Sequence, residues 1–395
     1  PGDHVDVTAQ NALSMLTRDD DYLGLVEEYL SQLDDAGRTA ERLKLASGDG
    51  DEAAAAERVE RSLREAAAVG RTLDWSMATE VDLGRVRDPL VSLQQAPTGP
   101  LLRRAGQHAA RAGEEQHHAA HRRRTAWELE SALDDLTRGP FGAIEPLLSR
   151  PTLVLLGEAG SGKSHSLARL VDTHVGAGGA GILLLGQYFG AGDPRLQLLQ
   201  RLGLGALSFD VFLGALQAAA LATGRPAVLA IDALNESRAA EEWLNTLAGL
   251  AADVSRFDRV ALVVSCRSTY EAYCVPETLP ALRLEHVGFE GDAARAAKVY
   301  LDKHGIDRPA APFLDPEFTN PLFLSTCVRA LRAENLRAFP LGLDGLFRLF
   351  DFWLSAVEKS LRRRGFAPIQ PGGGVLRRAL DRFAEQLALE RREDL

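Results

Sequence analysis

One segment of the sequence has the residues of a phosphate-binding loop. The letters GEAGSGKS run from Gly157 to Ser164 and match the pattern GxxxxGK[ST]. The apolar run Thr152–Leu156 precedes the segment, and Ser166–Leu170 can open a helix after it. Glycines let backbone N–H groups curl around anionic oxygens, and the amino-terminal end of the following helix carries partial positive charge. The motif and its strand–turn–helix context predict a P-loop that holds the phosphates of ATP or GTP together with Mg²⁺.

The residues of this loop have separate expected roles. Lys163 is expected to reach the β- and γ-phosphates, and Ser164 is expected to ligate Mg²⁺. The whole nucleotide-binding segment comprises Gly157, Glu158, Ala159, Gly160, Ser161, Gly162, Lys163, Ser164 and His165. The alternative is a glycine-rich turn that matches the motif by chance. The agreement of motif and context argues against this alternative.

An acidic pair follows another apolar run. Asp232 ends the run Ala227–Ile231, and Glu236 stands four residues later. Ligands of open α/β sheets bind at the carboxyl ends of parallel strands, so Asp232 is expected to hold Mg²⁺ through water. Glu236 is expected to orient or deprotonate the water that attacks the γ-phosphate, with Asn235 positioning that water or the loop. The alternative is that Asp232 caps the next helix and Glu236 lies on its solvated first turn.

A basic side chain follows the buried run Val260–Ser265. The chain continues through Cys266, for which packing is expected, to Arg267 at the same edge of the sheet. Arg267 is expected to sense or neutralise the γ-phosphate, which completes a catalytic set with Lys163, Asp232 and Glu236. The alternative is an exposed surface arginine.

Four motifs in this order resemble a known class of NTPases. GEAGSGKS, AIDALNE, VVSCRS and TNPLFLS together resemble the STAND class of signal-transduction NTPases, specifically its NACHT-like and bacterial antiviral (AVAST, Avs) branches. The spacing of Asp232 and Glu236 favours NACHT-like over NB-ARC members. The resemblance covers about residues 153–324 and, more faintly, the helices to residue 395. Asn235 departs from it, because many NACHT proteins have an acid there.

The resemblance implies a function and one further contact. It implies a switch that binds ATP and Mg²⁺, hydrolyses ATP slowly or when triggered, and forms a homo-oligomer on activation by an unknown protein such as a phage protein. It also implies that Pro321 contacts the base or ribose. Pro321 equally suits the first position of a helix capped by Asn320 or Thr319, and both can hold. No winged-helix histidine is identified beyond His304, which suits a solvated helix end.

Alternating elements must position these residues. Short apolar runs at 153–156, 182–185, 227–231 and 260–265 alternate with helical stretches, which predicts an α/β fold. We expect a P-loop NTPase core whose parallel sheet is covered by helices on both faces. The expected domains are an α-helical bundle or linker to an effector (1–138), the P-loop core (139–287), a helical lid (288–340) and the start of a winged-helix or helical module (341–395).

Composition limits the partners. The net charge is −10 and the arginine-rich patches are local, so nucleic acid is not indicated. No run approaches the ~18–20 apolar residues of a membrane span, and the three cysteines form no CxxC pair. We expect a cytoplasmic protein without a membrane partner, and, because the chain starts at Pro1, a fragment of a longer one. His117 and His121 could share a helical face, but without an HExxH motif a solvated helix is expected.

Two further classes of function stay open at this point. A continuously cycling AAA-like ATPase motor or chaperone would turn over ATP without a trigger. A scaffold with structural ATP would not depend on Glu236.

Overall fold

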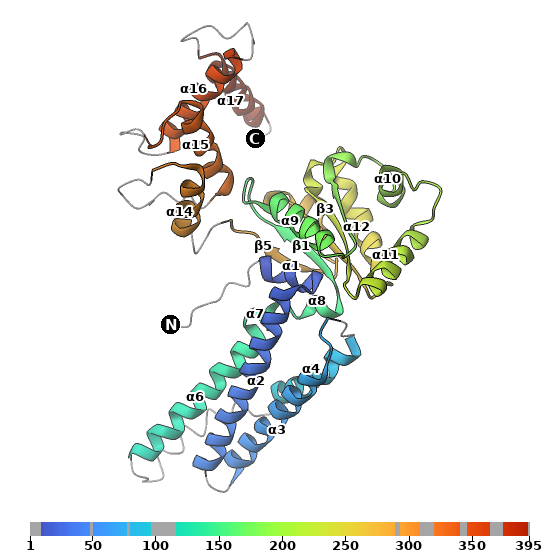
Figure 1. Ribbon diagram of the computed structural model, residues 1–395, viewed down its shortest axis with the longest axis vertical. Helices are drawn as coiled ribbons and strands as arrows, with labels where there is room; N and C mark the ends of the chain where they lie inside the picture. Colours follow the sequence, from blue (N-terminus) through green and yellow to red (C-terminus); the bar gives the residue numbers. More distant parts are fainter. Residues whose placement is uncertain are drawn as a thin grey trace. The chain divides into compact units, whose positions relative to one another are not determined.

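Five parallel strands form one sheet (Figure 1). They are β1 (Thr152–Leu156), β2 (Gly181–Leu185), β3 (Ala227–Asp232), β4 (Val260–Ser265) and β5 (Leu282–Glu285), in the order β2-β3-β4-β1-β5. Every neighbouring pair is parallel. The predicted parallel sheet is confirmed, and four of its strands match the predicted runs to within one residue at each end. β5 is an additional strand that the apolar runs did not predict.

The computed structural model describes residues 9–47, 50–76, 80–95, 116–288, 293–307, 320–339, 346–363 and 374–393. The cap candidate Thr319 lies outside these ranges. The chain divides into two units. The first comprises residues 1–157 and 163–286, and the second comprises residues 158–162 and 287–395.

The two faces of the sheet bury alternate residues of each strand. Val228 and Ala230 lie in one apolar core, whereas Leu229 and Ile231 lie in the other. Helices α1 (Ala9–Thr17), α7 (Pro140–Ile144), α8 (Pro146–Ser149) and α9 (Lys163–Gly176) contribute to the first core. Helices α10 (Pro194–Arg201), α11 (Phe209–Thr223), α12 (Trp243–Val254) and α13 (Glu271–Cys274) contribute to the second. Both faces are therefore covered, as an all-parallel sheet requires.

The amino-terminal region is helical, as predicted. Its long helices are α2 (Asp20–Ser47), α3 (Asp51–Thr72), α4 (Glu80–Gln95) and α6 (Gln116–Arg138), and α2 lies alongside both α3 and α6 (Figure 1). Leu33, Leu63 and Leu129, one from each of these three, are completely buried. The core of this bundle continues through α1 into the α9 face of the sheet, so bundle and sheet belong to one unit.

The second unit contains helices and no strand among its described residues. Its helices are α14 (Ala293–His304), α15 (Pro321–Ala333), α16 (Leu346–Arg363) and α17 (Val375–Glu393). Leu301, Leu324 and Val328 are buried in its small core. The region after the sheet is therefore helical, as expected. Across the described parts of both units, no helix is long and apolar enough to cross a membrane.

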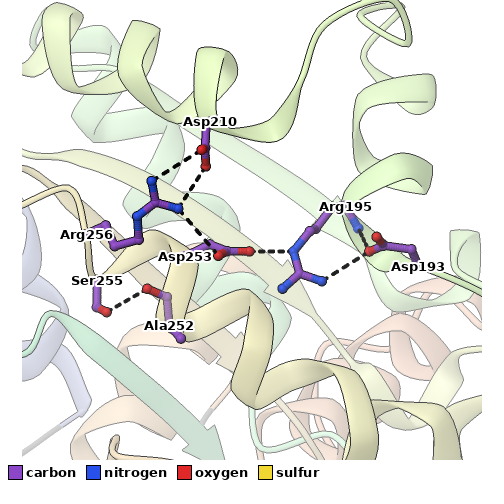
Figure 2. A network of polar contacts seen from close by, with 7 residues as sticks. All are labelled: Asp193, Arg195, Asp210, Ala252, Asp253, Ser255 and Arg256. Carbon is purple, nitrogen blue, oxygen red and sulfur yellow. Dashed lines mark hydrogen bonds and ion pairs between the residues drawn. The ribbon is translucent and has the colours of Figure 1, made fainter.

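Alternating charges connect α10, α11 and α12 on the face of the sheet opposite α9 (Figure 2). Asp193 caps α10 by accepting a hydrogen bond from the Arg195 backbone N–H, and Arg195 Nε donates to Asp253 Oδ2 at 2.5 Å. Asp253 also lies 3.9 Å from Arg256, which donates two hydrogen bonds to Asp210. The carboxylate of Asp253 is thus the shared centre of the network.

Replacing Asp253 with Asn is expected to destabilise the first unit modestly. The carboxylate is about three-quarters buried and serves two arginines, so its loss should cost about 1 kcal/mol. For a unit of this size, the midpoint of thermal unfolding should fall by about 2–4 °C. Asp210→Asn is the matched control, because its ion pair with Arg256 is more than half exposed and should contribute little. Equal effects of the two variants would contradict a central role for Asp253.

Candidate phosphate-binding site

The backbone of the P-loop has the conformation that its glycines permit. Gly160 and Gly162 have φ angles of 80° and 110°, a region that other residues rarely adopt. Lys163 is the first residue of α9, so the loop leads directly from β1 into the helix amino terminus. Ser164 and His165, in the first turn, are exposed to solvent. A buried strand, a glycine loop and a helix start therefore follow one another as the motif requires.

Lys163 is held against the start of the loop. Its Nζ donates a hydrogen bond of 2.5 Å to the carbonyl oxygen of Gly157, and only 8% of the residue is exposed. Burial is the main cause that lowers the pKa of Lys163, and the positive charge of Arg267 lowers it further. The negative charge of Glu285 opposes this most strongly, and that of Asp232 opposes it less. The ammonium group is thus fixed by the backbone, and charges at or just after the ends of three other strands shift its pKa.

Asp232 is buried at the carboxyl end of β3. Its Oδ1 accepts a hydrogen bond of 2.5 Å from Ser265 Oγ, at the end of the neighbouring strand β4. Ser265 Oγ in turn accepts a hydrogen bond of 2.8 Å from the N–H of Ala233, whose φ of 58° turns the chain away from the strand. The carboxylate therefore bonds to β4, and among the described residues its side chain caps no helix. Asp232 Oδ2 accepts no hydrogen bond from the residues that the structure describes.

The loops after β3 and β4 are connected by two contacts of Arg267. Its backbone N–H donates to Asn235 Oδ1 at 3.1 Å, and its Nη2 lies 3.5 Å from Glu236 Oε1. Glu236 ends the 3₁₀ turn η2 (Leu234–Glu236), and both partners of this ion pair are roughly half exposed. Asn235, at the position where the resemblance would expect an acid, thus positions the loop rather than adding charge.

The edge formed by β5 adds groups that the sequence analysis missed. Glu285 pairs in register with Leu156, directly before the P-loop, and Ser268 Oγ donates to Glu285 Oε1 at 2.6 Å. The next residue, His286, forms a 3.0 Å hydrogen bond between its Nε2 and Ser166 Oγ on α9. Burial lowers the pKa of His286, and the charge of Lys163 lowers it further. The only signal of this strand in the sequence is the alternation of apolar and polar residues in Leu282–Glu285, and four residues are too few to identify a strand.

The residues present fit a nucleotide phosphate and a hydrated Mg²⁺ ion. The observation that supports the fit is the buried carboxylate of Asp232 at the end of β3. Its Oδ1 accepts the hydrogen bond from Ser265, and its charge raises the pKa of the buried Lys163. Lys163 would hold phosphate oxygens. Ser164 would ligate the ion directly, and Asp232 would hold it through water. Among the described residues, this site included, no group of three or more histidine, cysteine, aspartate or glutamate side chains could hold a metal. His121 is exposed on α6, and the side chains of His117 and His118 lie outside the described set.

Pro321 begins α15 in the second unit, as the capped-helix alternative predicted. Asn320 Oδ1 accepts hydrogen bonds from the N–H groups of Leu322 and Phe323, at 2.9 and 3.3 Å. Within the same unit, Asn320 Nδ2 donates to the carbonyl of Ala159 at 2.9 Å. A base contact of Pro321 stays a prediction. His304 ends α14, where its ring contacts Tyr300 and Arg332, and Cys266 packs in the core of the first unit.

Fold and site together define a class: an α/β domain with a five-stranded parallel sheet, consistent with a P-loop fold. No protein-family model matches the sequence, and a search of curated proteins finds no significant match.

Proposed function

We propose that the chain is an ATP-binding and ATP-hydrolysing molecular switch of the STAND class, NACHT-like, that uses Mg²⁺. The observation that carries the proposal is the meeting of three predicted residues at one edge of the sheet. Lys163, Asp232 and Arg267 come from separate segments at the carboxyl ends of the strands. The charge of Arg267 lowers the pKa of Lys163, and that of Asp232 raises it. A cation, a carboxylate and a second cation around a P-loop are the groups that phosphoryl transfer needs.

The side chains divide the proposed reaction among themselves. Lys163 and Arg267 stabilise negative charge on phosphate oxygens, and Ser265 orients the Asp232 carboxylate through its hydrogen bond. Mg²⁺, when bound, supplies further neutralisation of phosphate charge. Glu236 accepts a proton from the attacking water. In the described geometry Glu236 pairs with Arg267, so that arginine must leave Glu236 or serve both groups when it meets phosphate.

The contacts of Arg267 favour a switch. Phosphate binding competes with Glu236 for the guanidinium group, and any shift of Arg267 also acts on Asn235 through the backbone hydrogen bond. Occupancy of the site would therefore alter the loops after β3 and β4 together. The order of the four motifs supports the STAND assignment, and with it nucleotide-dependent homo-oligomerisation in bacterial antiviral defence. In this proposal a protein trigger such as a phage protein starts assembly, and hydrolysis resets the switch.

Glu236→Gln is expected to separate binding from hydrolysis. The amide keeps the hydrogen-bonding shape but cannot accept the proton, so ATP should still bind while turnover falls by about 10²–10⁴-fold. ATP affinity, phosphate release and molecular mass should be measured in one preparation with Mg²⁺. A switch predicts slow turnover by the wild type and persistence of the ATP-bound oligomeric state in the variant. Fast unstimulated turnover in a closed ring would contradict the switch and favour a motor.

Glu241→Gln is the matched control, because this exposed carboxylate lies on the neighbouring turn η3 (Ala240–Glu242) and has no assigned role. It should leave both binding and turnover unchanged. Equal turnover by Glu236→Gln and the wild type would remove Glu236 from the mechanism and support a structural nucleotide.

A further inference from the structure

Glu285 is a carboxylate for which the proposed reaction has no use. It ends β5, and its register partner Leu156 is the residue directly before the P-loop. The hydrogen bond from Ser268 Oγ, 2.6 Å long, holds one carboxylate oxygen. A negative charge is therefore fixed beside the place where phosphates are expected, which is an unfavourable position for it once a nucleotide is bound.

Ser268 connects this carboxylate to the P-loop lysine. While its hydroxyl donates to Glu285, its backbone N–H donates to the carbonyl of Gly157 at 3.3 Å. The same carbonyl accepts the 2.5 Å hydrogen bond of Lys163 Nζ. Glu285 and Lys163 are thus both fixed relative to one backbone oxygen. Among the negative charges that raise the pKa of Lys163, that of Glu285 has the largest effect, larger than that of Asp232.

We propose that Glu285 is the counter-charge of Lys163 in the nucleotide-free protein and makes the site selective for metal-complexed over metal-free nucleotide. The inference rests on the proposed function, since it concerns the same phosphate site. An incoming phosphate must bind the ammonium group of Lys163 while the carboxylate of Glu285 repels it. The repulsion grows with the charge of the ligand, so it penalises free ATP, with about four negative charges, more than its Mg²⁺ complex, with about two.

The neutral variant Glu285→Gln isolates the charge. The amide oxygen can still accept the hydrogen bond from Ser268, so the loop contact is kept while the negative charge is lost. Metal-free ATP should bind about fivefold more tightly to the variant, and the Mg²⁺ complex only about twofold, because the repulsion halves with the ligand charge. Glu285→Lys, a change of two charges, should increase the metal-free gain to about 25-fold.

The experiment is equilibrium binding of ATP and of inorganic tripolyphosphate, each with EDTA or Mg²⁺, at low and at 0.5 M salt, on the whole chain. High salt should reduce the gain. Glu277→Gln is the matched control, because it removes an exposed carboxylate from the segment between α13 and β5 and should leave all affinities within twofold. Circular dichroism confirms that each variant is folded.

The outcomes are distinguishable. Tighter metal-free binding by both Glu285 variants, in proportion to charge, supports the inference. Unchanged affinity, or an equal gain with and without Mg²⁺, overturns it while leaving the proposed function intact. If the wild-type chain binds neither ATP nor tripolyphosphate, the proposed function fails, and the inference fails with it.

Discussion

Lys163→Ala should abolish nucleotide binding, with a loss of affinity of about a hundredfold or more. The ammonium group is buried at the first residue of α9 and is held by Gly157, so its position is fixed before a ligand arrives. Removing one member of a buried, hydrogen-bonded charge pair costs about 2–5 kcal/mol, which corresponds to this loss. Calorimetric titration with ATP and Mg²⁺ measures the effect directly.

The control for this variant is Lys298→Ala. Lys298 is an exposed lysine on α14, and its truncation should leave the affinity for ATP unchanged. Thermal unfolding of both variants should stay close to that of the wild type, since neither side chain fills an apolar core. If Lys163→Ala binds ATP as tightly as the wild type, the segment Gly157–Ser164 is not the nucleotide site, and the proposed function is lost.

Gly186→Ala, which adds one methyl group near the site, should strongly lower the free energy of unfolding. Gly186 follows β2, and a Cβ atom there would lie 2.0 Å from the carbonyl oxygen of Ala233 and 3.0 Å from that of Asp232. Both obstacles are backbone atoms that cannot rotate away, so β2 must move from β3 at the end that carries Asp232. We expect a loss of about 3 kcal/mol and a fall of about 5–10 °C in the unfolding midpoint.

Gly190→Ala is the matched control, four residues further along the same loop. A Cβ atom at Gly190 would meet nothing within 4 Å, and its backbone does not require glycine. Its unfolding midpoint should therefore lie within about 1 °C of the wild type. Because Asp232 ends β3 beside the displaced end of β2, Gly186→Ala should also weaken Mg²⁺-dependent ATP binding. Equal stability of the two variants would show that β2 and β3 are not packed as closely as the structure has them.

The sheet could be predicted from the sequence because of how it is buried. Strands covered on both faces consist of continuous apolar runs, as residues 153–156 and 260–264 do, and such runs are visible without a structure. β5 forms the edge of the sheet and is only partly buried, so Leu282 and Leu284 alternate with Arg283 and Glu285. Its pattern is too short to distinguish from a loop, and the groups at its end were missed with it.

Only those residues of the site that directly follow predicted strands could be placed from the sequence. Asp232 and Arg267 follow apolar runs, so the parallel topology alone predicts that they share an edge. The hydrogen bonds that each of them makes depend on details that spacing does not contain. Ser265 looks like the last residue of a strand, yet its hydroxyl supports Asp232, and the left-handed turn at Ala233 occurs at a residue type that rarely adopts it.

The helical region shows a related limit. Tyr22, Val26 and Leu33 recur at helical spacing in the sequence, and all three are buried on α2. Periodicity does not say which surface a helix will find. The packing of α1 against α9 and β3 therefore could not be predicted, although it joins the bundle and the sheet in one core.

This shared core has a mechanical consequence. α1 contacts the helix that begins at Lys163, and after α1 the chain continues into the 28 residues of α2. At 1.5 Å per residue, α2 is about 42 Å long. If α1 and α2 follow α9 as a rigid lever, a tilt of about 5° at the phosphate-binding helix displaces the far end of α2 by about 4 Å. The bundle would in this way amplify a movement that is hardly measurable at the nucleotide.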